Sequence, residues 1–246
     1  MTDTTRRQAT VLDIAAPTPD VRVVRLGLAG APFDFQAGQY VRLWFGDLAP
    51  RDYSLGSIPG SSELEFHIRV NAERGVGLYV GTRLRQGETL ALAGPFGDAY
   101  WRAEHTGPML AVAGGTGVVP IKSVVETALR HGTIAPLHVY IGARTALDLY
   151  LEAHFRALAQ KYANLNFVAA VSESEFANGH RTGNVSELVG EDFDDLFRFK
   201  AYVAGPPPMV AATQDILRAR GIDAADIHTD AFVPGDHSSK GAIAKS

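Results

Sequence analysis

The stretch Arg-Asp-Tyr-Ser at positions 51–54 combines three side chains that could bind a cofactor. The Arg51 guanidinium can pair with a phosphate, the Tyr53 ring can stack on a flat ligand, and the Ser54 hydroxyl can donate or accept a hydrogen bond. An exposed ion pair between Arg51 and Asp52, and ordinary packing of Tyr53, would explain the same residues more plainly. Taken alone, the stretch leaves both interpretations open.

A second candidate is the turn Gly-Gly-Thr-Gly at 114–117, which follows an apolar run and precedes an amphipathic one. Glycines at a strand-to-helix turn allow a phosphate to approach the backbone, and the helix N-terminus supplies N–H groups and a positive dipole end. The G-x-G-x-x-G fingerprint is met only in part, because Pro120 stands in place of the third glycine. Ile121 before Lys122 breaks the P-loop pattern. A nucleotide-binding turn and a plain tight turn both remain open.

Two further turns have the composition of binding loops. Gly-Pro-Pro-Pro-Met at 205–209 follows an apolar run, and ligands of open α/β sheets bind at the carboxyl ends of strands. Gly-Val-Gly-Leu at 75–78 offers backbone N–H groups that suit a phosphate. A rigid proline-rich connector is the plainer explanation of the first of these turns.

The first hundred residues contain short apolar runs separated by Gly, Pro, Ser and Asp. Within 64–70 the apolar residues recur at every second position, which is typical of a half-buried strand. Short strands at this spacing predict an antiparallel barrel. The expected strands are 9–14, 21–28, 40–45, 63–70 and 89–93, with one helical patch at 78–84.

From residue 108 the pattern changes to strands that alternate with helices, which predicts βαβ units and a parallel sheet. The expected strands are 109–113, 137–141, 166–172, 202–204 and 227–232, and the expected helices are 120–130, 148–162 and 209–220. The acidic run at 191–195 is expected to start a solvent-exposed helix. The chain is therefore expected to hold a β-barrel domain at 1–103 and an α/β domain at 104–246.

Composition excludes several classes of function. The net charge of −4 argues against an electrostatic nucleic-acid binder. The chain contains no cysteine, which excludes disulfides, thiolate nucleophiles and a cysteine-ligated iron–sulfur cluster. The 8 histidines show no metal-ligand spacing, and no apolar stretch approaches membrane-spanning length. A cytoplasmic protein is expected, with no metal, nucleic-acid or membrane partner.

The motifs stand in a fixed order: R-x-Y-S, the glycine turn at 75–78, G-P-F-G at 94–97, G-G-T-G and G-P-P-P-M. As an ordered set they resemble the ferredoxin–NADP reductase-like flavoproteins, especially the reductase components of bacterial oxygenases. The resemblance runs from Gly38 to Phe232. It implies that the barrel binds FAD and that the α/β domain binds a nicotinamide dinucleotide.

The resemblance also implies a role for each matching residue. Arg51 pairs with the flavin phosphate, Tyr53 stacks on the isoalloxazine ring, and Ser54 lies near flavin N5. Phe232 covers the other flavin face, so Ser54, Tyr53 and Phe232 are the predicted catalytic residues. The other predicted cofactor contacts are His67, Ile68 and Arg69 along the ribityl chain, Gly75, Val76, Gly77 and Leu78 under the pyrophosphate, and Gly115, Thr116, Gly117, Arg144, Gly205, Pro206 and Met209 around the nicotinamide dinucleotide.

Two positions depart from the family pattern. Many relatives have serine or threonine where Gly77 stands, so one hydroxyl contact is lost and looser flavin binding is expected. Many also have cysteine where Ala204 stands, beside the reacting nicotinamide carbon, so slower hydride transfer is expected. Arg144 is the lone candidate for a 2′-phosphate contact, which favours NADH and leaves NADPH open.

The sequence thus predicts an FAD-dependent reductase that takes a hydride from NADH and passes single electrons to another protein. Because this chain has no cysteine, the iron–sulfur partner must be another polypeptide or a domain outside this chain, and a ferredoxin or Rieske-type protein on a separate chain is expected. Two alternatives remain. An NAD(P)H:flavin reductase with diffusible flavin is favoured by Gly77, and a non-catalytic nucleotide-binding module is favoured by Ala204.

Overall fold

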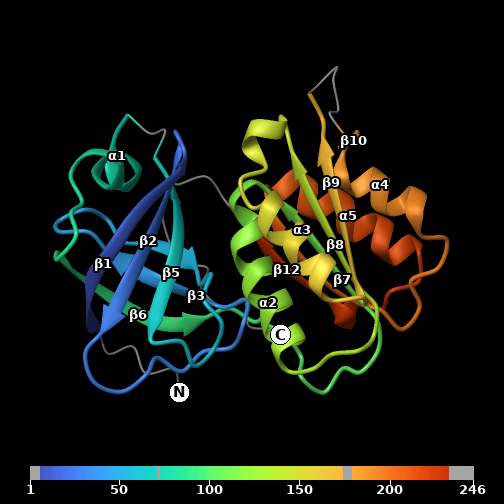
Figure 1. Ribbon diagram of the computed structural model, residues 1–246, viewed down its shortest axis with the longest axis horizontal. Helices are drawn as coiled ribbons and strands as arrows, with labels where there is room; N and C mark the ends of the chain where they lie inside the picture. Colours follow the sequence, from blue (N-terminus) through green and yellow to red (C-terminus); the bar gives the residue numbers. More distant parts are fainter. Residues whose placement is uncertain (1–5, 71–72, 174–178, 233–246) are drawn as a thin grey trace, which may run out of the picture.

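The computed structural model describes residues 6–70, 73–173 and 179–232, and its ribbon shows two bodies side by side (Figure 1). The first body contains a six-stranded antiparallel sheet and the second a six-stranded parallel sheet. The predicted fold class, a flavin-type barrel domain followed by an α/β domain, is confirmed. No helix of the described ranges is long and apolar enough to span a membrane.

The barrel sheet has the strand order β4-β3-β6-β1-β2-β5. Side chains that alternate along each strand decide which residues enter the barrel core. In β5 the side chains of Leu64, Phe66 and Ile68 are buried among the barrel residues, as the period of two predicts. Its elements are β1 (Arg7–Thr18), β2 (Val21–Leu28), β3 (Tyr40–Trp44), β4 (Arg51–Ser54), β5 (Glu63–Arg69), α1 (Gly75–Thr82) and β6 (Thr89–Phe96).

The R-x-Y-S stretch is itself a strand, β4, which the expected strands omit. It pairs antiparallel with β3, so that Ser54 lies opposite Tyr40 and Arg51 lies opposite Leu43. A strand of four residues, none of them fully buried, gives no clear period, and this is why it escapes detection from the sequence. Helix α1 begins at Gly75, three residues before the expected patch.

The second sheet has the order β10-β9-β8-β7-β11-β12, and helices cover both faces. Helices α2 and α3 pack on one face and α4 and α5 on the other, which Figure 1 shows as a front and a back layer. The elements are β7 (Met109–Gly114), η1 (Gly115–Gly117), α2 (Val118–Arg130), β8 (Leu137–Ala143), η2 (Ala146–Asp148), α3 (Glu152–Lys161), β9 (Leu165–Val171), β10 (Arg181–Thr182), α4 (Val185–Asp192), β11 (Lys200–Gly205), α5 (Pro207–Ala219), η3 (Ala224–Asp226) and β12 (Ile227–Ala231).

Two expectations about helices in this body are wrong. The helix expected at 148–162 begins only at Glu152, because Thr145 and Asp148 form a capping box around the separate turn η2. The acidic run at 191–195 does not start a helix, since Glu191 and Asp192 end α4. Acids at a helix C-terminus are unfavourable there, and Arg181 forms ion pairs with both.

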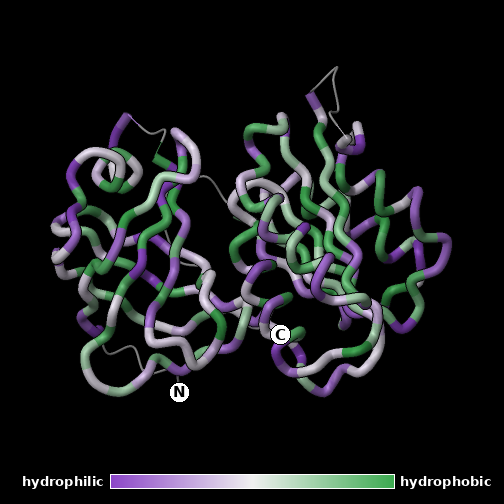
Figure 2. The backbone as a smooth tube through the Cα atoms, in the orientation of Figure 1, coloured by the Kyte–Doolittle hydropathy of each residue, from purple (hydrophilic) through white to green (hydrophobic). Residues whose placement is uncertain are grey.

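Burial differs between the two sheets. Every residue of β7 is buried, as expected for a parallel strand covered on both faces, whereas the barrel strands alternate. Figure 2 shows this as hydrophobic colour along the central strands of the α/β body. The predicted boundary at 103/104 falls between β6 and β7 and stays a prediction; Trp101, just before it, packs in the α/β core.

The barrel core offers a stability test. Phe66 is fully buried, whereas Phe197 is 70% exposed on a loop of the α/β body. We expect Phe66→Ala to lower the free energy of unfolding by about 3–5 kcal/mol, because it leaves a cavity. Phe197→Ala, the matched control, is expected to change it by about 0.5 kcal/mol or less. Urea unfolding measures both, and equal losses would contradict the core assignment.

Candidate functional site

Two glycine-rich turns from distant parts of the chain meet at the carboxyl ends of β7 and β11, which are parallel neighbours. A Cβ on Gly117 would stand 2.1 Å from the Ala204 carbonyl oxygen. A Cβ on Gly114 would stand 2.5 Å from Met209 Sδ. Glycine is therefore required at position 117, where the obstacle is backbone, while at position 114 a larger residue would force the Met209 side chain to move. The turn at 114–117 and the turn at 205–209 line one crevice, as their places after strands predict.

A pocket of ≈ 460 Å³ opens beside these turns, a volume within the usual range for a small-molecule site. The ends of three parallel strands and the start of α4 contribute to its walls. The residues used below are Gly115, Arg144, Asp148, Glu187, Pro206 and Met209. Four of the seven predicted dinucleotide contacts, Gly115, Arg144, Pro206 and Met209, thus line one pocket, while Thr116, Gly117 and Gly205 are not part of its lining.

Arg69 reaches this pocket from the barrel. Its Nη2 would stand 3.1 Å from a Cβ on Gly115, and its Nη1 donates a hydrogen bond to Asp20 at 2.7 Å. The sequence predicts Arg69 beside the flavin ribityl chain; in the structure its side chain lines the pocket of the α/β body, and the ribityl contact stays a prediction. A cation beside a glycine turn suits a phosphate group.

The side chains of β4 form the other half of the site. Asp52 pairs with Arg42 at 2.7 Å, so the plainer interpretation of an Arg51–Asp52 ion pair does not hold. Within the described residues, the Arg51 guanidinium makes no hydrogen bond or ion pair. An unpaired guanidinium on an accessible strand suits an anionic ligand. Burial raises the pKa of Tyr53, so its hydroxyl stays neutral.

Helix α1 lies close to this strand through aromatic contacts. The Phe45 ring meets Tyr53 edge-on at 6.1 Å and meets Tyr79 of α1 at the same distance. The first turn of α1 has no acidic residue and no side-chain cap, and Gly75 adopts a positive φ of 74°. The N–H groups of this turn therefore remain open to an anion. Val76 is buried, so any contact it makes with a ligand is through its backbone.

The side chains of His67 and Ile68 are engaged elsewhere. Ile68 is buried in the barrel core. His67 lies between Glu65 Oε1 and the Tyr150 hydroxyl, each 3.0 Å from one of its ring nitrogens. Neither side chain is left to contact a flavin.

The backbone of β5 offers a different route to the predicted contact. β5 is the last strand of its sheet, and on its outer edge Glu65 N–H donates to Ser57 Oγ while Glu65 C=O accepts from Gly56 N–H. Alternate residues of an antiparallel strand direct their backbone groups to the same edge. The backbone of His67 therefore also faces outward, toward the β4 side.

Ser54 contacts a residue that the sequence did not single out. Its Oγ donates a hydrogen bond to Asp230 Oδ2 at 3.3 Å, across 176 positions of the chain. Asp230 lies in β12, and two residues later the Phe232 N–H donates to the Gly205 carbonyl at 2.8 Å. Only a weak signal in the sequence points to Asp230: it is an acidic residue two positions before the aromatic Phe232, at the end of the last strand.

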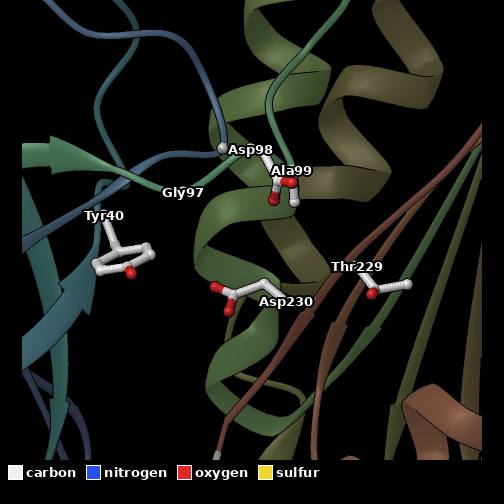
Figure 3. A pocket seen from close by; sticks show the side chains of 7 residues that line it. Tyr40, Gly97, Asp98, Ala99, Thr229 and Asp230 are labelled. Atoms are coloured by element: carbon white, nitrogen blue, oxygen red, sulfur yellow. The ribbon is translucent and has the colours of Figure 1, made fainter. Parts of the chain in front are cut away.

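A second hollow of ≈ 340 Å³ lies beside Asp230, between the two bodies. Figure 3 shows Tyr40 from the barrel side facing Asp230 of β12 across it, and Asp98 and Thr229 also belong to its lining. Burial and the nearby carboxylates of Asp52, Asp230 and Asp98 raise the pKa of Tyr40. The region around the Ser54 hydroxyl is therefore acidic. Within the described ranges no group of three potential ligands could hold a metal ion.

A barrel with an open anion site beside an α/β nucleotide crevice defines a two-domain, nicotinamide-linked flavoprotein reductase. The family of oxidoreductase NAD-binding domains matches residues 111–215. The chain belongs to the ferredoxin–NADP reductase-like family of oxygenase reductase components, and it is an oxidoreductase.

The family assignment depends on relatives that align with most of the chain. The reductase component of the naphthalene 1,2-dioxygenase/salicylate 5-hydroxylase systems of Ralstonia sp is 39% identical over 92% of this chain and 69% of that protein. The corresponding naphthalene dioxygenase component of Pseudomonas putida is 37% identical over 93% and 69%. The solved ferredoxin reductase of carbazole 1,9a-dioxygenase has a TM-score of 0.83 at 26% identity, over 93% of this chain and 70% of that one.

The contact between the two turns gives a test of the crevice. We expect Gly117→Ala to weaken dinucleotide binding by about tenfold or more, because the new methyl group collides with the Ala204 carbonyl. Gly190→Ala is the control, since its Cβ meets only Ile216 Cγ2 at 3.3 Å. Titration with NAD⁺ measures both affinities. Unchanged binding by the Gly117 variant would contradict the assignment of this crevice.

Proposed function

We propose that this protein is the FAD-containing reductase of an oxygenase system, and that it transfers electrons from NADH to a separate iron–sulfur protein. The observation that carries the proposal is the contact between two half-sites, where Ser54 of the R-x-Y-S strand meets Asp230 beside the glycine crevice. Two nucleotides bound at these half-sites would have their reactive ends in one place. Two of the similar relatives are named as ferredoxin–NAD(P)⁺ reductase components.

The residues of the barrel fit FAD. Arg51 is the unpaired cation for a phosphate, the open first turn of α1 supplies N–H groups for a second one, and Tyr53 provides a neutral ring. When bound, FAD supplies the capacity to accept a hydride and release electrons singly. Ser54 holds its hydroxyl toward this position through its hydrogen bond to Asp230.

The residues of the crevice fit a nicotinamide dinucleotide. The glycines at 114–117 and at 205 allow the dinucleotide to approach the backbone, and Arg69 provides the cation for its pyrophosphate. Phe232, held by its N–H to the Gly205 carbonyl, closes the site near the flavin face. These groups orient the two cofactors and exclude water from between them.

NADH is favoured over NADPH by the charges of the pocket wall. Asp148 and Glu187 both line it, against the single cation Arg144 at the adenosine end. Asp148 Oδ2 already accepts hydrogen bonds from the Thr145 N–H and hydroxyl, which fixes its carboxylate in place. A fixed carboxylate accepts from a ribose hydroxyl and repels a 2′-phosphate.

The electron acceptor in this proposal is a ferredoxin or a Rieske-type protein on a separate chain. The names of the relatives support an acceptor of this kind in their own systems. The chain itself has no cysteine with which to bind such a cluster. The weaker alternative is a flavin reductase with diffusible flavin, since Gly77 brings no hydroxyl to the pyrophosphate turn.

The flavin half-site can be tested with two substitutions in β4. We expect Arg51→Ala to weaken FAD binding by about tenfold to a hundredfold, because it removes a charged hydrogen-bond donor. Ser54→Ala is expected to retain FAD but to be reduced by NADH about tenfold more slowly, since its hydroxyl acts at the reacting end. The exposed Arg83→Ala serves as control. Gel filtration followed by absorbance measures occupancy, and a wild-type protein that elutes without flavin would support the diffusible-flavin alternative.

The overall function is tested by anaerobic mixing with NADH and with NADPH. We expect NADH to bleach the flavin faster, and no bleaching by either would overturn the proposal. Asp148→Asn keeps an acceptor oxygen but loses the charge, so it is expected to raise the NADPH/NADH ratio about tenfold, given repulsions on the order of 1–4 kcal/mol at such distances. Asp215→Asn, a 79% exposed acid outside the pocket, is the control. An unchanged ratio would contradict the role of Asp148.

A further inference from the structure

A buried polar cluster joins the barrel to the α/β body away from both pockets. We call Lys122 of α2 with Glu65 and His67 of β5 the Lys122 bridge. Lys122 Nζ lies 3.2 Å from Glu65 Oε1, which is also 3.0 Å from His67 Nε2. The side chains are 14%, 16% and 2% exposed, respectively. Tyr150, from the segment before α3, closes the other side of the imidazole at 3.0 Å.

The same face of α2 also binds the segment that follows β4. Lys122 Nζ donates to the Gly56 carbonyl at 3.0 Å, and Ser123 Oγ donates to the Ser57 carbonyl at 2.6 Å. Gly56 is packed so closely that a Cβ would stand 3.1 Å from Val119 Cγ1. These contacts attach α2 to the chain two and three residues after Ser54.

The positions of these contacts along α2 connect the two half-sites by a short path. The dinucleotide turn η1 ends at Gly117, where α2 begins, and Lys122 lies little more than one helical turn further. The flavin strand ends at Ser54, two residues before Gly56. A helix is stiff over such a length, so a shift of α2 against the barrel moves the dinucleotide turn with respect to Ser54.

The chemistry of the Lys122 bridge is better suited to fixing the orientation of α2 against the barrel than to stabilising the contact between the two bodies. A buried ion pair gains little net stability because its charges lose their hydration, and it is favourable only when its geometry is good. Here Lys122 Nζ also lies 3.4 Å from Glu126 Oε1, and Glu65 Oε2 lies 3.3 Å from Arg25 Nη2. Although burial raises it, the His67 hydrogen bond and the Lys122 charge bring the pKa of Glu65 down to about 2. The carboxylate is therefore charged at every ordinary pH. An apolar contact of the same area would allow sliding, which this charge pair resists.

We propose that the Lys122 bridge is a positioning device that fixes the distance between the dinucleotide turn and the flavin strand. This inference rests on the proposed function, because it gives the reductase a determinant of hydride transfer outside both cofactor sites. None of the bridge side chains contacts either pocket in the described structure. The bridge therefore acts through α2 and the 56–57 segment.

The kinetic test uses Lys122→Met, which keeps side-chain length but removes the charge. We expect flavin content and NADH affinity to stay within about twofold of wild type, since neither pocket changes. Flavin bleaching by NADH is expected to slow tenfold to a hundredfold, on the order of the loss caused by misplacement of about 1 Å. The long-wavelength charge-transfer absorbance of the stacked NADH–flavin pair is expected to fall in parallel. Lys122→Arg, which retains a cation, is expected to recover most of the rate.

The matched control is Lys200→Met. Lys200 is equally buried, with a side chain 13% exposed, and it forms an ion pair with Asp226 inside the α/β body. Loss of a buried lysine there costs stability without touching the barrel. Wild-type bleaching in the Lys200 variant and slow bleaching in the Lys122 variant support the proposal. Equal rates in both would overturn it.

A second measurement does not depend on cofactor chemistry. Because the chain has no cysteine, Gln86→Cys in the barrel and Gln160→Cys on α3 provide two unique, exposed spin-label sites. Double electron–electron resonance on the apo protein is expected to give one narrow distance distribution, broadened by Lys122→Met and not by Lys200→Met. If Lys122→Met proves unfolded, Ser123→Ala, which removes one hydrogen bond to Ser57, is the substitute with the same expected broadening.

The outcomes separate this proposal from the proposed function. If wild type is not bleached by NADH, the reductase assignment fails, while the distance measurement still tests the bridge. If wild type is bleached but Lys122→Met keeps both its rate and its narrow distribution, the positioning role fails and the reductase assignment stands.

Discussion

The whole arrangement depends on the attachment of helix α2 to the barrel. Ser123 is completely buried and its hydroxyl donates to the Ser57 carbonyl, while Val119 packs on Gly56. Removing the Ser123 hydroxyl would leave the buried Ser57 carbonyl without this donor, so the contact costs more to lose by substitution than its size suggests. Because α2 starts at the dinucleotide turn and contacts the segment that directly follows the flavin strand, both half-sites share this one support.

The same interface has a defined dependence on pH. The pKa of Glu65 falls from an ordinary 4.5 to about 2 in the folded chain, despite burial that raises it. A depressed acid contributes stability that is complete above the unfolded pKa and disappears as pH falls through the folded value. The charge pair with Lys122 therefore holds at neutral pH and fails only in strong acid.

The parts of the fold that were predicted from the sequence are those with a strong local period. The alternation of β5 and the uninterrupted apolar run of β7 are local signals, and both strands end within a residue of expectation. β4 has four residues and no such period, and η2 replaces a helical turn through a capping box that competes with helix. The hydrophobic pattern therefore failed at these two elements, because the first is too short to show a period and the second is determined by a local capping box.

The residues of the candidate site could be predicted from their motifs, but their arrangement in space could not. The period of β5 shows that His67 and Arg69 point out of the barrel, but not what covers that face. Only the packing of the α/β body decides that Arg69 reaches the dinucleotide crevice and that His67 meets Tyr150. Asp230 is still harder to predict, since its partner Ser54 lies 176 positions away. Contacts of this kind depend on the whole topology.

The two departures from the family pattern have unequal weight once the geometry is known. Ala204 is 2% exposed, and it is its carbonyl, not its side chain, that stands against Gly117. The crevice is therefore built from backbone atoms that a cysteine or an alanine supplies equally. The main support for a non-catalytic module thus weakens, although slower hydride transfer stays a prediction. Gly77 differs, because it leaves the α1 turn with backbone N–H groups alone. The proposed flavin binding therefore depends more strongly on Arg51.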